Sequence, residues 1–478
     1  MSIITTTHSV SDSLNDKTKM NTTNSAASSK LNSVIALEAE WILPMTQTPD
    51  CSDKHPESTQ WLEGHAVIVS GREILEVIPV NEISNRYPDA EISPLDGMAL
   101  MPGLINAHCH AAMSLLRGFS DDLPLLQWLE TAIWPAEAQF VDDQFVYQGT
   151  QLAIAEMLRG GTTCFQDMYF MPDQIAKAVQ QSGIRANIGL MVVDSETVWA
   201  RDADECISKG LRVYDQYKHN DHLTFSFAPH APYTVTKQTL EKLSTLSFEL
   251  SLNIHMHLHE TTAEVNDYTN QHNIRPLEQL HKMGLLNPQL NAVHMTHLNQ
   301  QEIDWLTETG THVIHCPQSN MKLASGCCPT SLLLDAGVNL AIGTDGAASN
   351  NDLDMLAEVQ SAALLAKIDS LNPEKMPAYQ GLYAATMGGA KALGLENKIG
   401  SLEQGKQADI IAIDLNQIET QPVYNPISQI VYAASRNQVT HVWVAGKKLL
   451  DNRKLTSLNE KAIMNNAKSW KEKIKNCH

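Results

Sequence analysis

The sequence of 478 residues contains no apolar run near the roughly 18 residues that a membrane-spanning helix requires. Its polar beginning, with Asp12, Lys17 and Lys19, lacks the apolar core of a signal peptide. Its eight cysteines include no CxxC pair, which argues against a thiolate zinc site and against a disulfide-rich secreted domain. We therefore expect a soluble, cytoplasmic protein.

Positive charge is scarce as well. The chain has 34 Lys and Arg residues against 54 Asp and Glu residues, which gives a formal net charge of −20. Because so acidic a surface repels phosphate backbones and anionic lipids, no binding to nucleic acid or to a membrane is expected. The apolar content of 43% is enough for a large core and argues against a disordered chain.

The two ends of the chain differ in composition from its middle. Sixteen of residues 1–30 are Ser, Thr or Asn, and so polar a segment predicts a disordered tail. Runs of β-branched residues predict strands at 33–45, 65–80, 408–414 and 441–445. These strands indicate one small β-sandwich domain assembled from residues 31–98 and 400–478.

Eight apolar runs recur through the middle of the chain, and each ends in polar, Gly or Pro residues. They occupy residues 104–110, 161–168, 184–193, 223–230, 252–259, 291–297, 311–316 and 338–345. Segments with helical apolar spacing lie between them, at 142–159, 236–246, 274–283 and 300–309. Eight strand–helix repeats in about 240 residues predict an α/β fold of the (β/α)8 barrel type over residues 99–399. The competing doubly wound sheet would not need eight such strands in one series.

The most specific feature is the segment MPGLINAHCH at 101–110, in which His108 and His110 are two residues apart. On a strand both side chains therefore leave the same face. Two imidazoles at the C-terminal end of the first barrel strand form half of a metal site. Taken alone, the pair could equally be two ordinary strand histidines, so the interpretation depends on the other motifs.

A second cluster, NIHMHLHET at 253–261, contains three alternating histidines whose spacing alone does not choose a metal ligand. His257 is distinguished by Glu260 three residues later, because a carboxylate just beyond a ligand places a proton carrier beside metal-bound water. We therefore predict His257 as a ligand and Glu260 as the acid/base. His255 and His259 are assigned to the core or to the layer behind the ligands.

Two further residues follow later strands. His294 lies about one strand–helix unit beyond His257, and Asp345, in AIGTDGAASNN, follows the last apolar run. An isolated Asp in that position would most often cap a helix. Three histidine ligands need a fourth ligand, however, which favours ligation by Asp345. All these residues fall at C-terminal strand ends, the face where barrel enzymes build their active sites.

Five motifs in order resemble those of the amidohydrolase superfamily. They are MPGLINAHCH, the HxxE of His257 and Glu260, AVH at 292–294, HCPQSNMKLASG at 315–326 and GTDGAASNN at 343–351. Within the superfamily they are similar to the branch that holds S-adenosylhomocysteine/5′-methylthioadenosine deaminases and triazine hydrolases. The resemblance runs from about residue 33 to residue 454, and it implies the same barrel and two-ended β domain.

The resemblance also implies one divalent metal ion, usually zinc. Its ligands would be His108, His110, His257 and Asp345. Binuclear relatives carry a bridging carboxylated lysine at the end of strand four, where this chain has His230 in APHAPYT. One ion per chain is therefore expected.

Substrate contacts are implied by the resemblance too. In similar deaminases a Glu in a WPxE segment and the strand-four His contact the nucleoside, and the matching residues are Glu137 and His230. The alternative is that Glu137 is a helix-surface carboxylate and that His230 is a core histidine. An arginine that some relatives use for the substrate carboxylate or ribose has no clear counterpart, and Arg201 is the nearest candidate.

These parts support hydrolytic attack on a ring carbon that bears an amino group. Zinc lowers the pKa of its bound water toward 7. Asp345 can take the water proton and Glu260 can protonate the ring nitrogen, so both also contact the substrate, while His294 steadies the attacking oxygen. We expect a zinc-dependent deaminase that converts 5′-methylthioadenosine, S-adenosylhomocysteine or adenosine to the inosine analogue and ammonia.

Two other hypotheses stay open. One is another ring hydrolase, of the guanine or triazine amino- or chlorohydrolase type, although Glu137 and His230 favour a nucleoside. The other is a non-catalytic metal-binding or assembly protein, which Glu260 and Asp345 argue against because a structural zinc site closes its coordination. Cytidine-type deaminases need a PCxxC segment, which is absent. The expected partner is a small-molecule substrate, and homo-oligomerisation is left open.

Overall fold

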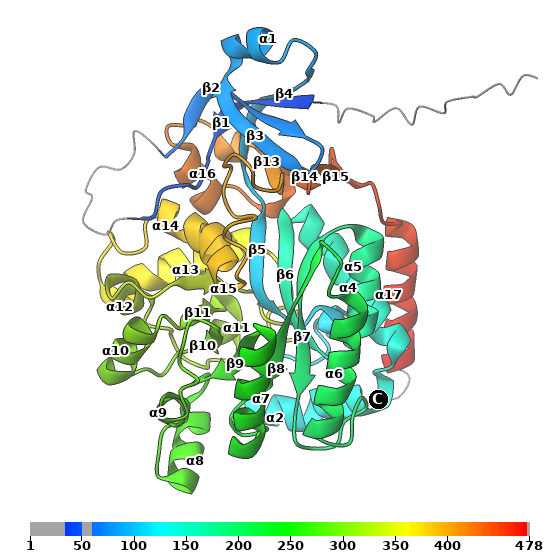
Figure 1. Cartoon of the computed structure of the whole chain (residues 1–478), viewed down its shortest axis with the longest axis vertical. Helices are drawn as coiled ribbons and strands as arrows, with labels where there is room; N and C mark the ends of the chain where they lie inside the picture. The colour runs from blue at the N-terminus through cyan, green and yellow to red at the C-terminus, as the bar shows by residue number, and fades with distance from the viewer. Residues whose placement is uncertain (1–33, 50–59, 476–478) are drawn as a thin grey trace, which may run out of the picture.

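Two eight-stranded sheets organise the chain in the computed structural model, which describes residues 34–49 and 60–475 (Figure 1). One sheet is a parallel barrel wrapped by helices, and the other is a mixed sheet built from N- and C-terminal segments. The predicted fold class is therefore confirmed. The disordered tail predicted for residues 1–30 lies outside the described residues, and the predicted domain boundaries stay a prediction.

The barrel contains one strand for each of the eight apolar runs. In chain order the strands are β5 (Leu104–Cys109), β6 (Thr162–Tyr169), β7 (Arg185–Val192), β8 (Leu223–Pro229), β9 (Asn253–Leu258), β10 (Leu290–His294), β11 (His312–His315) and β12 (Leu340–Ile342). Neighbours in this series are hydrogen-bonded in parallel. The barrel nearly closes after β12, where the amides of Thr344 and Asp345 donate to the carbonyl of His108 at 3.1 and 3.0 Å.

Two strands end three residues before the apolar runs that predict them. The run at 291–297 continues past β10, and the run at 338–345 continues past β12. The backbone leaves the extended conformation there, with φ of 76° at His294 and 61° at Asp345. Apolar sequence therefore continues into the turns that carry site residues, because these turns are buried as well.

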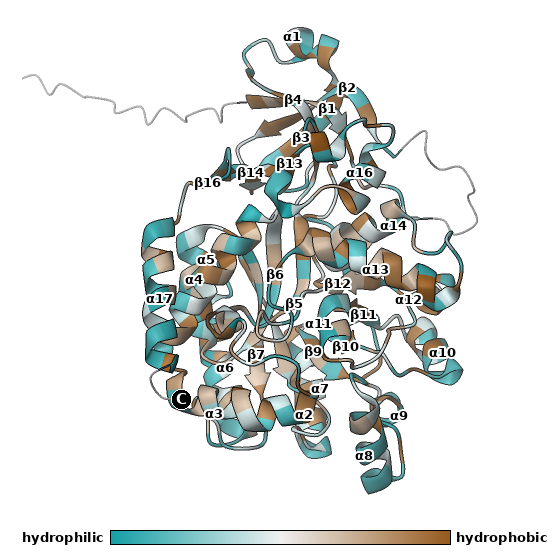
Figure 2. Ribbon diagram, turned by 180° about the vertical axis from the view of Figure 1, so that it is seen from behind, coloured by the Kyte–Doolittle hydropathy of each residue, from teal (hydrophilic) through white to brown (hydrophobic). Residues whose placement is uncertain are grey.

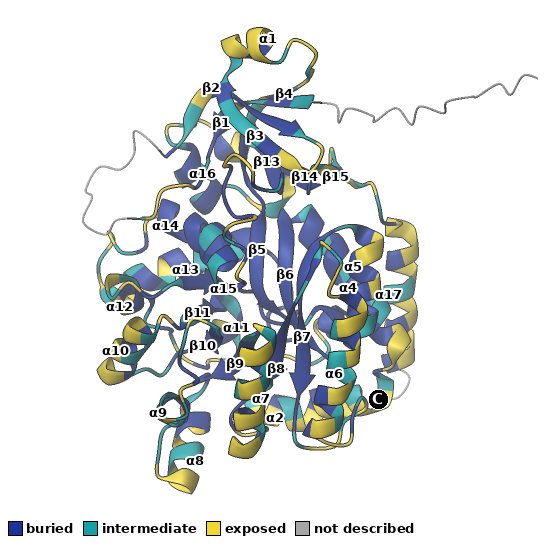
Figure 3. Cartoon of the chain, in the orientation of Figure 1, coloured by how far each residue is buried: buried dark blue, intermediate teal, exposed yellow. Residues whose placement is uncertain are grey.

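Helices cover the outside of the barrel, and polar side chains fix where the longer ones begin. Asp142 and Thr236 cap two of them by accepting backbone N–H groups, and Asn299 forms a capping box with Glu302. Their outer faces are exposed and mostly polar, whereas the strands inside are buried (Figures 2 and 3). The helices around the barrel are α4 (Asp143–Arg159), α5 (Pro172–Ser182), α6 (Ala203–Tyr217), α7 (Lys237–Leu250), α8 (Thr262–His272), α9 (Pro276–Lys282), α10 (Gln300–Thr309), α11 (Pro317–Lys322), α12 (Thr330–Asp335), α13 (Met355–Ser370), α14 (Ala378–Tyr383), α15 (Gly389–Ala392) and α17 (Glu460–Lys475).

The second sheet joins the two ends of the chain. Its strands follow the order β16-β15-β14-β13-β4-β1-β2-β3, so that β4 pairs antiparallel with β13. They are hydrogen-bonded as one continuous mixed sheet. Their bounds are β1 (Val34–Ile42), β2 (Leu62–Ser70), β3 (Glu73–Pro79), β4 (Glu91–Pro102), β13 (Ile410–Asp414), β14 (Val439–Val444), β15 (Lys447–Asp451) and β16 (Lys454–Leu455). The short helices α1 (Ile83–Arg86) and α16 (Pro426–Tyr432) flank it.

The second sheet and the active-site face lie at opposite ends of the barrel. Because β4 leads almost directly into β5, the sheet sits over the N-terminal ends of the barrel strands (Figure 1). At the other end the chain after β5 forms the helical segment η3 (Ala111–Leu116), α2 (Leu125–Trp128), η4 (Leu129–Ile133) and α3 (Trp134–Phe140). No helix in the described residues is long and apolar enough to cross a membrane.

A buried ion pair connects the barrel to the second sheet. Arg185, at the start of β7, donates from Nε and Nη2 to the two carboxylate oxygens of Asp409 at 3.0 and 3.2 Å. Both side chains are almost fully buried. A second connecting pair, Arg72 with Asp221, is 2.6 Å long but lies in solvent. The two pairs therefore both link the barrel to the second sheet, one in the interior and one in solvent.

Replacing Arg185 with Met should lower the free energy of unfolding by about 3–5 kcal/mol, because it leaves the carboxylate of Asp409 buried without its partner. Urea titration measures the change without screening charges. The matched control is Arg72→Met, for which the loss should stay below about 1 kcal/mol because water screens that pair. Equal losses in the two variants would contradict this assignment.

Candidate active site

Four predicted ligands meet at the C-terminal end of the barrel. His108 lies on β5 and His110 directly after it, His257 lies on β9, and Asp345 follows β12. One donor atom from each lies within 4.8 Å of the other three. His108, His257 and Asp345 are buried, and His110 is only slightly exposed. The structure therefore brings together residues up to 237 positions apart in the sequence, as predicted.

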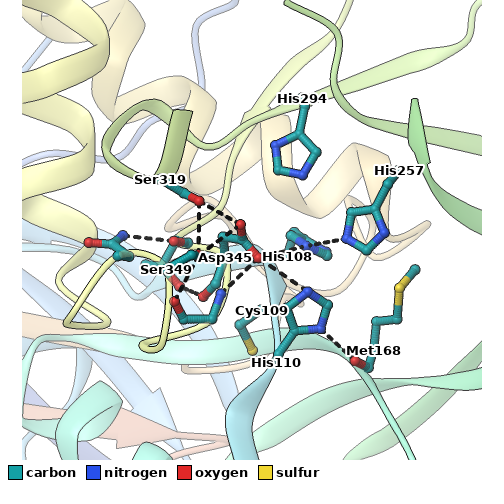
Figure 4. A network of polar contacts seen from close by, with 12 residues as sticks. His108, Cys109, His110, Met168, His257, His294, Ser319, Asp345 and Ser349 are labelled. Atoms are coloured by element: carbon teal, nitrogen blue, oxygen red, sulfur yellow. Dashed lines mark hydrogen bonds and ion pairs between the residues drawn. The ribbon is translucent and has the colours of Figure 1, made fainter. Parts of the chain in front are cut away.

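Hydrogen bonds behind the three histidines turn the same nitrogen of each ring toward the centre (Figure 4). His110 Nδ1 lies 2.6 Å from the carbonyl of Met168, and His257 Nδ1 lies 2.8 Å from the carbonyl of His230. A carbonyl can only accept, so each Nδ1 carries a proton, and in the neutral ring each Nε2 then presents a lone pair to the centre. This arrangement is typical of histidines that bind a metal through Nε2.

The distances between donor atoms fit one tetrahedral ion. His108 Nε2 lies 3.1 Å from His257 Nε2 and 3.4 Å from Asp345 Oδ1, and His110 Nε2 lies 3.1 Å from the same oxygen. Zinc bonds of roughly 2.0–2.1 Å in tetrahedral geometry place ligand atoms about 3.3 Å apart. Lone pairs facing one another at this distance repel unless a cation lies between them. The four residues therefore fit a divalent metal ion.

Asp345 is held by groups that sequence analysis did not assign. The hydroxyls of Ser319 and Ser349 lie 2.6 and 3.1 Å from its Oδ2 and donate to it, which leaves Oδ1 facing the histidines (Figure 4). Gly343 allows the segment that carries Asp345 to pack closely against β5, because a Cβ at that position would lie 2.8 Å from the backbone nitrogen of His108. The two serines follow β11 and β12, in the motifs at 315–326 and 343–351, and their place after barrel strands is the signal that could have identified them.

His255 lies directly behind His108. His108 Nδ1 and His255 Nε2 are 2.8 Å apart, and since the Nε2 of His108 faces the ligand cluster, its Nδ1 donates to His255. His259 points elsewhere, with its Nδ1 3.1 Å from the carbonyl of His297. Both residues are fully buried. The prediction that they lie in the core or behind the ligands is confirmed.

Glu260 enters the site from the turn after β9. Its Oε2 lies 3.7 Å from His294 Nε2, and the hydroxyl of Ser325 lies 3.4 Å from Oε1. Glu264 fixes the turn by accepting the backbone amides of His259 and Glu260 at 3.1 and 2.7 Å. Burial, reinforced by the nearby charge of Asp345, raises the pKa of Glu260 to about 8. A carboxyl group with such a pKa can exchange protons near neutral pH.

His294 faces Glu260 without joining the ligand cluster. The side-chain amide of Asn320 lies 3.0 Å from its Nδ1 and donates to it. The neutral ring then carries its proton on Nε2, the atom that faces Glu260. Burial lowers the pKa of His294, which favours this neutral form. His294 therefore presents an N–H donor to the centre of the site.

A cavity of about 410 Å³ opens onto these residues. Glu137, on α3, and His230, after β8, both line it. The hydroxyl of Tyr169 donates to Glu137 Oε1 at 2.7 Å, while burial raises the pKa of Glu137 to about 7. Burial lowers the pKa of His230 to about 3, so its ring is neutral. Glu137 is thus a cavity residue rather than part of the outer helix surface.

Arg201 does not line the cavity. Its side chain is 78% exposed, and its Nε donates to Glu205 at 2.8 Å. The structure therefore does not place this candidate at the site.

Comparisons with known proteins agree with this architecture. Residues 99–449 match the model of the amidohydrolase family. The 5-methylthioadenosine/S-adenosylhomocysteine deaminase of Teredinibacter turnerae is 47% identical over 443 residues, which cover 92% of this chain and 97% of that protein. The protein of the same name from Saccharophagus degradans is 43% identical and covers 92% of this chain and 96% of its own.

A solved structure is similar over the same extent. An adenosine deaminase from Xanthomonas campestris with bound zinc has a TM-score of 0.89 and 46% sequence identity, covering 92% of this chain and 98% of that one. The resemblance inferred from the five motifs is therefore confirmed. The chain belongs to the amidohydrolase family.

Proposed function

We propose that this enzyme hydrolytically deaminates adenosine-type nucleosides such as 5′-methylthioadenosine. One observation carries the proposal: a single cavity joins the ligand cluster and Glu260 to the paired side chains Glu137 and His230. The ligand cluster and Glu260 suit hydrolytic attack on a purine ring. Glu137 and His230 suit hydrogen bonding to a ribose attached to that ring. The names of the two relatives and of the X. campestris enzyme support the same substrate class.

The proposed metal ligands are His108, His110, His257 and Asp345, holding one divalent ion, most simply zinc. The zinc in the X. campestris enzyme supports this choice. Such an ion supplies, when bound, a water molecule acidic enough to attack near neutral pH. Among the described residues no second group of donors is arranged in the same way, which supports one ion per chain.

Three side chains are proposed to move or hold protons in the reaction. Asp345 accepts a proton from the attacking water, and Glu260 delivers a proton to the ring nitrogen next to the attacked carbon. His294 donates its Nε2–H to the oxygen that becomes bonded to that carbon. The amino group takes up the proton that Asp345 received and leaves as ammonia, so that the C–N bond breaks after the C–O bond has formed. The remaining proton on the attacking oxygen returns to Glu260 as the carbonyl of the product forms.

Glu137 is proposed to bind the ribose. A carboxylate can accept hydrogen bonds from two sugar hydroxyls, and His230 can donate or accept one further hydrogen bond. Replacing Glu137 with Ala should therefore lower kcat/KM for 5′-methylthioadenosine by about 1.5–3 kcal/mol. A free base or a triazine should be nearly unaffected. Steady-state kinetics on both kinds of substrate measure the difference, and equal losses on both would mean that Glu137 shapes the α3 segment instead.

A substrate panel with ammonia detection tests the proposed function. Zinc-loaded protein should release ammonia from 5′-methylthioadenosine, S-adenosylhomocysteine or adenosine far faster than from guanine or a triazine. Activity on guanine or triazines alone would contradict the proposal and favour the other ring hydrolases. A cytoplasmic location and the absence of nucleic-acid partners stay part of the proposal and rest on composition. Homo-oligomerisation is left open.

A further inference from the structure

The outer part of the active-site cavity is apolar. Beyond Glu137 and His230, the helical segment after β5 and the loops after β6 and β7 supply most of the wall. The apolar side chains in this part of the wall include Trp128, Ile133, Trp134, Phe170, Val193 and Val198. With the base at the ligand cluster and the ribose at Glu137, this wall faces the 5′ substituent of the nucleoside.

Positive charge is missing from this wall. Among the described residues that line the cavity there is no Lys or Arg. The charged side chain in its outer part is acidic, Glu196, which lies in the loop after β7. Arg201, a few residues further on, is 78% exposed and paired with Glu205. A carboxylate bound in the outer cavity would therefore meet an acidic side chain and no cation.

The hydroxyls near Glu196 do not replace a cation. Thr197 Oγ1 lies 3.2 Å from the carbonyl of Ala200 and accepts the amide of the same residue at 3.1 Å, so its bonds remain within the loop. Ser195 is exposed to solvent and offers a neutral hydroxyl. A neutral donor compensates only part of the desolvation of a carboxylate.

Apolar side chains at the rim of the cavity are partly exposed to solvent. Trp134, Val198 and Tyr233 line the cavity and yet are 40%, 39% and 41% exposed. An apolar substituent that lies against them would remove this surface from water, which is favourable. A charged substituent would gain less from the same contact.

We propose that this outer cavity selects nucleosides with a neutral, apolar 5′ substituent, such as an alkylthio group, and disfavours the amino-acid tail of S-adenosylhomocysteine. The inference rests on the proposed function and narrows its substrate class. The ammonium group of that tail can approach Glu196, but its carboxylate has no partner. A carboxylate that lies against this wall gives up part of its hydration without gaining a charged partner, which weakens binding.

Three substrates separate the effect of the charge of the 5′ substituent from the effect of its length. The 5′-methylthio, 5′-n-butylthio and S-homocysteinyl derivatives of adenosine share base and ribose, and the last two have chains of similar reach. We expect kcat/KM to be similar for the two neutral substrates and lower by about 10- to 100-fold for S-adenosylhomocysteine. Equal loss with the butylthio compound would show that length decides, and equal efficiency for all three would show that charge is tolerated. Either result overturns the proposal.

Two variants test the wall directly. Val198→Arg adds a cation at the rim and should raise the efficiency ratio of S-adenosylhomocysteine to 5′-methylthioadenosine by about tenfold or more. Arg201→Ala is the matched control and should leave that ratio unchanged. A fall of the ratio in Arg201→Ala would show that Arg201 recruits the carboxylate, which contradicts the proposal.

Binding measurements keep this inference separate from the proposed function. Calorimetric titration of the Glu260→Gln protein measures the affinity for each of the three nucleosides in the absence of turnover. Differences between these affinities reflect contacts of the 5′ substituent in the outer cavity. If the wild-type enzyme deaminates none of them and the variant binds none, the proposed function is wrong and the inference falls with it. If all three bind with equal affinity while deamination proceeds in the wild type, the proposed function stands and only the outer-cavity inference is wrong.

Discussion

Replacing His108 with Ala should remove both the metal and the activity. The three remaining donors would hold the ion far more weakly, by at least about 100-fold, and kcat/KM should fall on the order of 10³-fold or more because the attacking water loses its activation. Metal analysis of purified protein measures the first effect, with about one zinc per chain expected in the wild type. Initial rates on 5′-methylthioadenosine measure the second.

His255→Ala provides a graded control for this variant. It leaves all four ligands in place and removes the acceptor 2.8 Å from His108 Nδ1. We expect metal affinity to fall by roughly 10- to 100-fold, between the values of the wild type and of His108→Ala. Unchanged far-UV circular dichroism shows that both variants fold. A full zinc content in His108→Ala would contradict the ligand assignment, as would two ions per active wild-type chain.

Glu260→Gln should keep the metal and lose turnover. Gln has the same size and shape as Glu but cannot carry the proton to the ring nitrogen, so kcat should fall roughly 10²–10⁴-fold. Glu260 is not among the four clustered donors, so zinc content should match that of the wild type. Single-turnover kinetics together with metal analysis measure the two effects on the same sample.

Glu264→Gln is the matched control for this substitution. Glu264 is a buried carboxylate on the same turn, but it acts through the amides of His259 and Glu260 and lies outside the cavity wall. Its replacement should lower kcat much less than Glu260→Gln does. Loss of zinc in Glu260→Gln, or a larger kinetic defect in Glu264→Gln, would contradict the proton-transfer role of Glu260.

Much of the fold could be predicted because the barrel strands are buried on both faces. All eight residues of β6 and of β7 are buried, and apolar stretches within such strands, such as residues 188–192 of β7, stand out in the sequence. The positions at which the strands end were predicted less accurately. Positive φ at His294 and Asp345 ends the extended conformation inside apolar sequence, and strand propensity does not register such turns.

The metal site could be predicted because its ligands occupy strand ends, so their spacing reports their position in the barrel. The contacts that the supporting groups make could not be predicted, although Ser319 and Ser349 also follow barrel strands. Ser319 and Asn320 belong to the short helix after β11, and their roles depend on contacts with Asp345 and His294, each 26 residues distant in the sequence. Serine and asparagine are common at helix starts, so their identity alone does not indicate an active-site role.

Which side chains line the cavity could not be predicted either, because the tertiary structure brings them together. Trp128 and Val198 come from segments separated by two strands and two helices, and both line the same wall. The sequence did suggest that a substrate-binding arginine has no clear counterpart. The outward direction of Arg201 and its pairing with Glu205 became visible only once the loop after β7 was placed.

The reaction itself can be tested most directly with 5′-methylthioadenosine in water labelled with heavy oxygen. The zinc-loaded wild-type enzyme should release one ammonia for each nucleoside consumed, and mass spectrometry of the product should locate the label on the purine ring of an inosine-type nucleoside. Release of free adenine, or a product whose ring carries no label, would contradict hydrolytic deamination and with it the function proposed for this cavity.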